Sequence, residues 1–331
     1  MKKRDVFHII LDSRSTTPKK KLGRAFAPSN IALCKYWGKR NEELNLPITS
    51  SISVSLGHLG TETTIAPAAD GVDTVILNDK VVPAKAAFAK GVTSYLNLLA
   101  PNRSTHFTVN TKNSIPTAAG LASSASGFAA LILSLNDLFE WKLDGKSLSI
   151  LARLGSGSAS RSIFTGFVEW MAGASEDGMD SYAEKLPIAW DDFRLGLLTV
   201  SDKAKDIASR QAMKRTRRTS PLFEAWPVKA QHDLVIMKDA LQTGDFDLVG
   251  KTAESNALSM HATSLGAWPP ILFWLPESVA LMHRIWALRE AGMRLYFTMD
   301  AGPNVKLLFL APQQADVEKE FPGVQVVAPF A

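Results

Sequence analysis

A run of small and hydroxyl residues at Ser114–Gly127 offers this chain a place to bind a phosphate. It follows an alternating, strand-like stretch at 105–111 and leads into apolar residues spaced three and four apart, which predict a helix as far as Phe139. A small-residue turn between a strand and a helix lets an anion approach the backbone and the unpaired N–H groups of the helix start. The three hydroxyls of Ser123, Ser124 and Ser126 add donors, so we predict a phosphate cradle here.

The loop fits neither of the two common nucleotide-binding motifs. A Walker loop has a lysine directly after its second glycine, and no lysine follows Gly120. A dinucleotide fingerprint has three glycines at fixed spacing, and only Gly120 and Gly127 are present. A helix start built of small residues for close packing would also look like this, so residues elsewhere in the chain must decide.

Three other segments carry groups that can bind or activate an acidic substrate. Residues 30–40 place two lysines, a tyrosine and an arginine near a strand end, as would an aromatic turn with exposed lysines. Residues 155–161 lead from glycines and serines to Arg161, whose guanidinium can hold a carboxylate or phosphate, although a serine-rich helix cap has the same pattern. Asp300 follows a predicted strand, where its carboxylate either projects into a cleft or opens a turn.

Two further polar segments are interpreted as structural. Residues 254–262 are predicted to be helical and to pack beneath a site, with His261 in a supporting or core position. The basic cluster of Lys214, Arg215, Arg217 and Arg218 favours a solvated helix face. The six histidines show no paired ligand spacing, and a single cysteine excludes a cysteine-rich zinc site.

The elements that must position these residues mix strands and helices without a regular βαβ rhythm. This order predicts an α+β fold with two domains, one at 22–190 that carries the phosphate loop and one at 191–331 that carries Asp300. Strands are expected at 23–27, 51–56, 61–66, 74–77, 105–111, 167–171, 195–200, 294–299 and 305–310, and an Asn78-Asp79 hairpin turn closes the fourth. Helices are expected at 84–99, up to 139, from 147, and at 221–241, 245–263 and 276–291.

Composition bounds the class of protein. The 331 residues are long enough for two domains, and 46% hydrophobic with 21% charged residues is ordinary for a globular chain. No apolar run approaches the roughly 20 residues of a membrane span, and the start lacks the apolar length and cleavage site of a signal peptide. The single Cys34 cannot form an intramolecular disulfide and fits a reducing cytoplasm. We therefore expect a cytoplasmic protein with no membrane partner.

The net charge of +5 comes from the N-terminus. Residues 1–24 hold eight basic and two acidic side chains, so the rest of the chain is close to neutral. We expect residues 1–21 to form a basic, poorly ordered extension. Nucleic acid is not an expected partner, because the basic residues lack interleaved aromatics.

Five strings resemble one family in their expected order. They are Asn30–Arg40 (NIALCKYWGKR), Leu46–Val54 (LPITSSISV), Pro116–Ser126 (PTAAGLASSAS), Ser156–Arg161 (SGSASR) and Asp300–Asn304 (DAGPN). From about residue 22 onward the chain resembles the mevalonate diphosphate decarboxylase family of the GHMP kinase superfamily. The resemblance implies a GHMP kinase-like two-domain fold with its active site in the cleft between domains, and a homodimer.

The resemblance also implies a reaction, the ATP-dependent decarboxylation of mevalonate 5-diphosphate to isopentenyl diphosphate. Asp300 matches the catalytic aspartate, Arg161 the arginine that binds the substrate carboxylate, and Lys35 a lysine that keeps the aspartate ionised. Tyr36 and Lys39 match positions that bind the 5-diphosphate, while Asn30, Ser156 and Ser158 match the substrate site around Arg161. ATP, with Mg²⁺, would be held by the loop residues Pro116, Ala118, Ala119, Gly120, Leu121, Ala122, Ser123 and Ser124. No Mg²⁺ ligand or adenine-binding residue is assigned.

One departure concerns the substrate phosphates. Family members carry an arginine that helps bind the diphosphate, and the corresponding stretch Asp73–Asp79 has none, with Thr74 at that place. A charge-assisted contact of this kind contributes about 1.5–3 kcal/mol. Either Lys112 or the cluster at 214–218 substitutes, or the substrate carries a single phosphate. The alternatives are therefore a decarboxylase or 3-kinase acting on mevalonate 5-phosphate or a related 3-hydroxy acid, and a non-catalytic binding protein.

Overall fold

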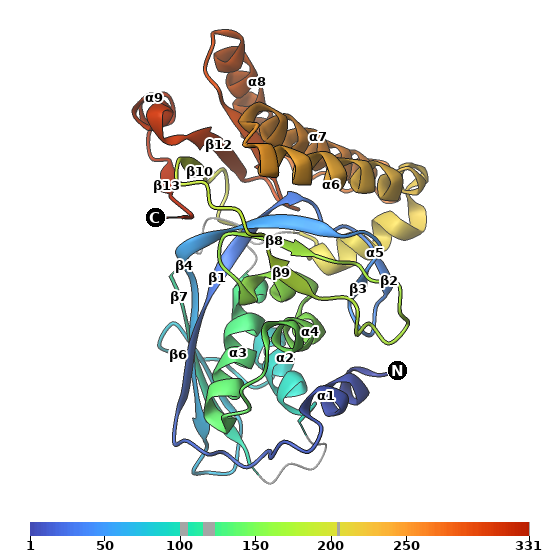
Figure 1. The fold of residues 1–331 in the computed structure, drawn as a ribbon, viewed down its shortest axis with the longest axis vertical. Helices are drawn as coiled ribbons and strands as arrows, with labels where there is room; N and C mark the ends of the chain where they lie inside the picture. The colour runs from blue at the N-terminus through green and yellow to red at the C-terminus, as the bar shows by residue number, and fades with distance from the viewer. Residues whose placement is uncertain (100–104, 115–122, 204–205, 331) are drawn as a thin grey trace.

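The computed structural model describes residues 1–99, 105–114, 123–203 and 206–330. The N-terminal half holds a seven-stranded sheet and the C-terminal half a four-stranded sheet, each flanked by helices (Figure 1). The predicted α+β class is confirmed. Among the described residues, no helix is both long enough and apolar enough to cross a membrane.

The larger sheet is built around one long antiparallel pair, β1 (Gly23–Cys34) and β4 (Ser51–Pro67). Two separate strands were predicted at 51–56 and 61–66, but β4 is continuous, because Gly57, at φ 56, joins the segment that pairs with β8 to the segment that pairs with β7. The sheet order is β6 (Lys80–Val81), β5 (Thr74–Leu77), β7 (Phe107–Asn113), β4, β8 (Phe167–Trp170) and β9 (Ala183–Lys185), with β1 on β4. The Asn78-Asp79 turn has positive φ at both residues, as the predicted hairpin requires.

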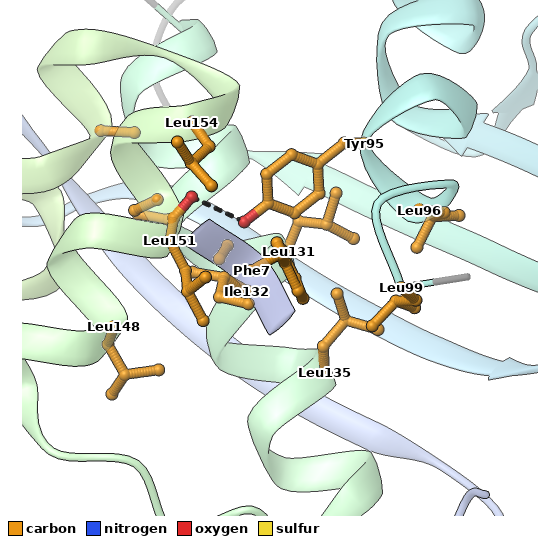
Figure 2. Close-up of a cluster of buried hydrophobic side chains, with 14 of the residues drawn as sticks. Phe7, Tyr95, Leu96, Leu99, Leu131, Ile132, Leu135, Leu148, Leu151 and Leu154 are labelled. Atoms are coloured by element: carbon orange, nitrogen blue, oxygen red, sulfur yellow. Dashed lines mark hydrogen bonds between the residues drawn. The ribbon is translucent and has the colours of Figure 1, made fainter. Parts of the chain in front are cut away.

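Four helices accompany this sheet: α1 (Lys3–Leu11), α2 (Ala87–Leu96), α3 (Ser123–Phe139) and α4 (Gly145–Gly155). The α3 helix packs on β1 and β4, and α4 begins where the Asp144 side chain accepts a hydrogen bond from the Ser147 N–H. Figure 2 shows the leucine and isoleucine side chains of α3 and α4 meeting between the helices, with the Tyr95 hydroxyl donating to the Leu151 carbonyl at 2.8 Å. This core fixes the end of α4 from which the Ser156–Arg161 segment continues.

The N-terminal extension differs from the poorly ordered segment that its charge suggested. Its helix α1 buries Val6, Phe7, Ile10 and Leu11 in the same core, and the Phe7 ring meets the edge of the Tyr95 ring at 5.9 Å. The following residues are also held, since the Trp141 indole N–H donates to the Ser15 carbonyl at 2.8 Å. Lys2 and Arg4 are exposed while an apolar stripe faces the domain, which is why net charge alone misjudged the segment.

The C-terminal half is an antiparallel sheet in the order β11 (Tyr296–Met299), β12 (Val305–Leu310), β10 (Phe193–Leu198) and β13 (Gln325–Val327). Its helices are α5 (Ser209–Thr219), α6 (Trp226–Thr243), α7 (Phe246–Leu265), α8 (Pro276–Glu290) and α9 (Gln314–Glu320). The α6 helix ends at Gly244, whose φ of 71 is the left-handed C-cap conformation. The α7 helix packs on both β11 and β1, so it joins the two halves at the point where β1 ends.

Candidate active site

The turn after β1 brings the side chains of Lys35, Tyr36 and Trp37 to the junction of the two sheets. It runs from Lys35 to Gly38 and leads into β2 (Lys39–Asn41), which pairs with β3 (Leu46–Pro47). Gly38 has a φ of 111, and a Cβ there would lie 2.7 Å from the Phe223 ring, so only glycine fits. The Trp226 indole N–H donates to the Trp37 carbonyl at 2.7 Å and ties the turn to the C-terminal half.

Asp300, directly after β11, faces two buried ammonium groups. Lys35 Nζ lies 3.0 Å from Asp300 Oδ1, and Lys306 Nζ, from β12, lies 3.8 Å from Oδ2. Burial lowers the pKa of both lysines, and the Asp300 carboxylate partly offsets this for each of them. Two cations beside one carboxylate favour its ionised form, so Asp300 is placed to accept a proton.

Two side chains of α7, Asn256 and His261, support the backbone of Lys35 and Asp300. Asn256 accepts a hydrogen bond from the Lys35 backbone N–H at 2.7 Å and donates to Asp233 at 2.8 Å. His261 Nε2 lies 3.1 Å from the Asp300 carbonyl oxygen, and burial lowers the His261 pKa to about 3. The imidazole is therefore neutral at physiological pH and supports the backbone, in agreement with its predicted supporting position.

Arg161 is a buried cation of the N-terminal half. It lies in the 3₁₀ helix Gly157–Ile163, is 3% exposed, and donates through Nη1 to the Ser51 hydroxyl and through Nε to Asn30 Oδ1 at 3.4 Å. The Asn30 amide in turn donates to Ser162 Oγ at 2.7 Å, which fixes its oxygen toward the guanidinium. Burial, partly offset by the Asp300 charge, lowers the Arg161 pKa to about 10. The guanidinium is therefore charged, oriented and available to an anion.

Tyr36 brings a buried hydroxyl to this part of the molecule. Its hydroxyl is buried without a hydrogen bond to any described residue, and its ring packs edge-on against Trp170 at 4.8 Å. Gly157 permits this position, because a Cβ there would come within 2.8 Å of the phenol. A buried hydroxyl without a partner is costly, which indicates that a ligand completes it.

One cavity of about 200 Å³, called the site cavity below, collects these groups from both halves. It is lined by the described candidates Asn30, Lys35, Tyr36, Lys39, Ser124, Ser156, Ser158, Arg161 and Asp300. The Ser124 and Ser156 hydroxyls lie 3.5 Å apart, so the start of α3 borders this cavity. The loop candidates Pro116, Ala118, Ala119, Gly120, Leu121 and Ala122 lie outside the described residues, as does the side chain of Ser123.

The basic residues suggested as substitutes for the missing arginine do not line the site cavity. The Lys112 ammonium pairs with Asp79 at 2.8 Å, and none of Lys214, Arg215, Arg217 and Arg218 lines the site cavity. Arg210 does line it, together with Ser209, at the N-terminal end of the helix whose other end carries that cluster.

Sequence reasoning missed Arg210 and Lys306. The buried residues Ala212, Met213 and Thr216 fit one face of a helix, and extending that pattern backward would have placed Arg210 in the first turn. Lys306 lies in an apolar strand, and only the sheet pairing of β11 with β12 brings it to Asp300.

Comparison with known proteins decides the family. A family model described as the diphosphomevalonate decarboxylase-like N-terminal domain matches residues 27–183, and one described as the mevalonate 5-diphosphate decarboxylase C-terminal domain matches residues 196–324. The chain belongs to the mevalonate diphosphate decarboxylase family. It is 38% identical over 307 residues to a diphosphomevalonate decarboxylase of Aspergillus fumigatus, which covers 86% of this chain and 76% of the relative.

Solved structures of the mevalonate diphosphate decarboxylase family share the fold. The enzyme from Staphylococcus aureus is 38% identical, with a TM-score of 0.88 over 94% of this chain and 96% of its own. The complex of the protein abbreviated MDDEF with MVAPP, AMPPCP and magnesium is 40% identical, with a TM-score of 0.87 over 93% and 97%. The predicted GHMP kinase-like two-domain fold is thus confirmed.

Proposed function

We propose that this chain catalyses the ATP-dependent decarboxylation of mevalonate 5-diphosphate to isopentenyl diphosphate, with release of ADP, phosphate and carbon dioxide. The relatives named diphosphomevalonate decarboxylase support this activity. The observation that carries it is the meeting of Asp300, between Lys35 and Lys306, with Arg161 in one cavity. A phosphoryl transfer needs the aspartate, and an elimination that expels carbon dioxide needs a cation to orient the carboxylate.

Asp300 acts on the C3 hydroxyl of the substrate. Its carboxylate accepts the hydroxyl proton as the oxygen forms a bond to the γ-phosphorus of ATP, while the bond from that phosphorus to the bridging oxygen breaks and ADP leaves with the electron pair. The C3–O bond then breaks and phosphate leaves with the electron pair. The C–C bond to the carboxylate supplies the electrons of the new double bond as carbon dioxide departs, and Arg161 holds that carboxylate in line until it leaves.

The two ends of the substrate are held by different groups. We assign the carboxylate to Arg161, with Ser156 and Ser158 beside it and Asn30 fixing the guanidinium. We assign the 5-diphosphate to Tyr36, Lys39 and Arg210, which line the same cavity. The partnerless Tyr36 hydroxyl supports this, since a phosphate oxygen would accept its hydrogen bond.

ATP and Mg²⁺ fit the donor set of the cavity. Ser124, Ser156 and Ser158 supply hydroxyls, which can donate hydrogen bonds to phosphate oxygens and offer Mg²⁺ oxygen ligands. The related complex with AMPPCP and magnesium supports the same pair here. When bound, ATP supplies the phosphoryl group and Mg²⁺ neutralises its charge. We assign the loop residues 116–124 to the ATP phosphates.

One assay tests the reaction. Purified protein is given ATP, Mg²⁺ and, in separate runs, mevalonate, its 5-phosphate or its 5-diphosphate, and released carbon dioxide is measured. We expect release from the diphosphate alone. Release from the monophosphate with equal or better kcat/KM would contradict the assignment of the diphosphate, and ADP formation without carbon dioxide would reduce the protein to a 3-kinase.

We also propose a domain boundary at residue 190, a homodimer and a cytoplasmic location. The boundary is supported by the change of sheet between β9 and β10. The dimer is supported by exposed apolar side chains at Leu222, Trp268 and Leu272, and the location by the single buried thiol of Cys34. Light scattering of the purified protein, with a monomer mass as the contrary result, tests the dimer.

A further inference from the structure

The N-terminal helix α1 brings a cation to the edge of the site cavity. Its apolar face docks in the core through Phe7, whose ring lies among the side chains of α3 and α4 in Figure 2. This docking places α1 on the side of the molecule that carries β2, β3 and α5 (Figure 1), and its first residue, Lys3, lines one cavity with residues of β2 and α5. Lys3 is half-buried there, and its backbone N–H donates to the Glu43 carboxylate at 3.3 Å.

A second cavity, called the cationic cavity below, has a volume of about 460 Å³. Its charged lining consists of Lys3, Lys39, Arg210, Lys214 and Arg217, against Glu42 and Glu43. Lys39, Arg210 and Met213 line both this cavity and the site cavity, so the two adjoin at the residues assigned to the diphosphate. The cationic cavity, with its excess of positive charge, therefore lies where the outer end of a bound diphosphate would lie.

Several of these cations already have protein partners. Lys39 donates to Asn45 at 2.6 Å, Arg217 donates to the Lys39 carbonyl, and Lys214 pairs with Glu42 at 3.4 Å. Lys3 and Arg210 line a further cavity together, beside α2 and α4. These two are the cations that α1 and α5 bring to the boundary of the site.

The positive groups are close enough to repel one another. Burial, together with the charges of Arg210 and Lys3, lowers the Lys39 pKa to about 8. Burial also lowers the pKa of Lys3, which Glu43 raises and Arg210 lowers. An anion bound among the three would relieve this repulsion and be held by each of them.

We propose that Lys3 binds the outer phosphate of the substrate diphosphate, so that α1 is part of the substrate site and supplies the positive charge absent at Thr74. The proposal rests on the proposed function. It assigns the inner phosphate to Tyr36 and Lys39 in the site cavity and the outer one to Arg210 and Lys3 at the boundary of the cationic cavity. Lys3 is then a residue that selects a diphosphate over a monophosphate.

The test compares Lys3→Gln with Arg4→Gln. Both remove one positive charge from the first turn of α1, but Arg4 is exposed and lines neither the site cavity nor the cationic cavity. Loss of one charge-assisted contact predicts that Lys3→Gln raises the KM for mevalonate 5-diphosphate about tenfold. The kcat, the KM for ATP and the thermal midpoint should stay near those of the wild type, and Lys3→Arg should restore the KM to within about threefold. Arg4→Gln should resemble the wild type throughout.

Two results would overturn the proposal while leaving the proposed function intact. One is an unchanged KM for the diphosphate in Lys3→Gln. The other is an equal rise in KM or Ki for mevalonate 5-phosphate, which would mean that Lys3 acts on the whole anion and not on its outer phosphate.

Direct binding separates this proposal from the reaction. Inorganic pyrophosphate is titrated calorimetrically into the wild type, Lys3→Gln and Arg4→Gln, with inorganic phosphate as the comparison. A loss of pyrophosphate affinity confined to Lys3→Gln supports the outer-phosphate site even if the wild type decarboxylates nothing. Equal pyrophosphate affinity in all three proteins overturns it.

Discussion

At the scale of single residues, the site depends on buried charged side chains that compensate one another. Lys35 is 2% exposed and Lys306 3%, and burial lowers the pKa of each lysine. The Asp300 carboxylate raises both values again, so the lysines and the aspartate keep each other charged. Removing one member leaves a buried charge uncompensated, which is more damaging than the loss of a surface pair.

Asp300→Asn removes the proton acceptor and keeps the shape of the side chain. We expect kcat to fall at least about 100-fold, the lower end of what a positioned general base contributes. ATP affinity should change less than about twofold, because Asp300 is assigned to the C3 hydroxyl. Steady-state kinetics and nucleotide titration measure the two effects. The control is Asp79→Asn, a surface partner of Lys112, and a variant retaining a tenth of wild-type kcat would refute the role of Asp300.

Lys39 gives the reaction an alkaline limit. Burial, with Arg210 and Lys3, lowers its pKa from the ordinary 10.5 to about 8. As the pH rises through about 8, the free protein loses this charge and with it attraction for the diphosphate. A bound anion raises the same pKa, so kcat/KM should fall above pH 8 while kcat stays level to a higher pH. In Lys39→Met this limb of the kcat/KM profile should vanish, and a flat wild-type profile to pH 9.5 would contradict the assignment.

At the scale of elements, two segments each combine basic residues with a buried helix face, and the sequence does not show which property decides their structure. The extension at 1–21 is basic, which suggested disorder, yet Val6, Phe7, Ile10 and Leu11 form one apolar face. Whether such a short stripe folds depends on a matching surface, and α2 to α4 supply it. The segment at 209–219 is similar. Its basic cluster at 214–218 was interpreted as a solvated helix face, but its first turn carries Arg210, which lines the site cavity.

The α7 helix supports the site through a histidine that stays neutral. Burial lowers the His261 pKa to about 3, whereas the unfolded chain takes up a proton near 6.5. Stability from this residue is therefore complete above pH 6.5 and lost as the pH falls toward 3. At pH 5 the loss is about 2 kcal/mol.

The variant His261→Gln tests this sign. Its free energy of unfolding, measured in urea at pH 5 and pH 7.5, should fall less on acidification than that of the wild type, by about 2 kcal/mol. His58→Gln, an exposed position, should keep the wild-type difference. The same pH dependence in all three proteins would rule out a neutral, buried His261.

At the scale of the whole molecule, the two sheets share a core. A continuous apolar cluster joins Ile31, Val54 and Phe167 of the larger sheet to Phe193 and Leu195 of the smaller one. The Phe167 and Phe193 rings meet edge to face at 5.4 Å. Lys35 follows β1 and Asp300 follows β11, so the shared core of the two sheets holds these two side chains in a fixed position relative to each other.

We expect the two halves to unfold together because of this core. Phe193→Ala should lower the stability by about 3–5 kcal/mol and shift one calorimetric transition as a whole. Val228→Ala, at an exposed position on α6, should leave the midpoint within about 2 °C of the wild type. Two separated transitions in Phe193→Ala, with only one displaced, would show that the halves are independent.

The sequence by itself determined the chemistry of this protein. Asn30–Arg40, Ser156–Arg161 and Asp300–Asn304 are local strings whose residue types suit phosphate and carboxylate binding, and their order matches one family. Strand and helix patterns located most elements because side-chain periodicity is a local property. The tertiary contacts of these groups could not be predicted in the same way.

Only the tertiary structure decided which distant groups complete the site. Lys306 reaches Asp300 through the pairing of β11 with β12, and Asn256 reaches Lys35 across 221 positions of the chain. Arg210 and Lys3 come to the boundary of the site through the docking of α5 and α1. Such contacts depend on how the apolar faces of different elements pack together. The sequence of one segment does not describe the surface of the other element on which it packs.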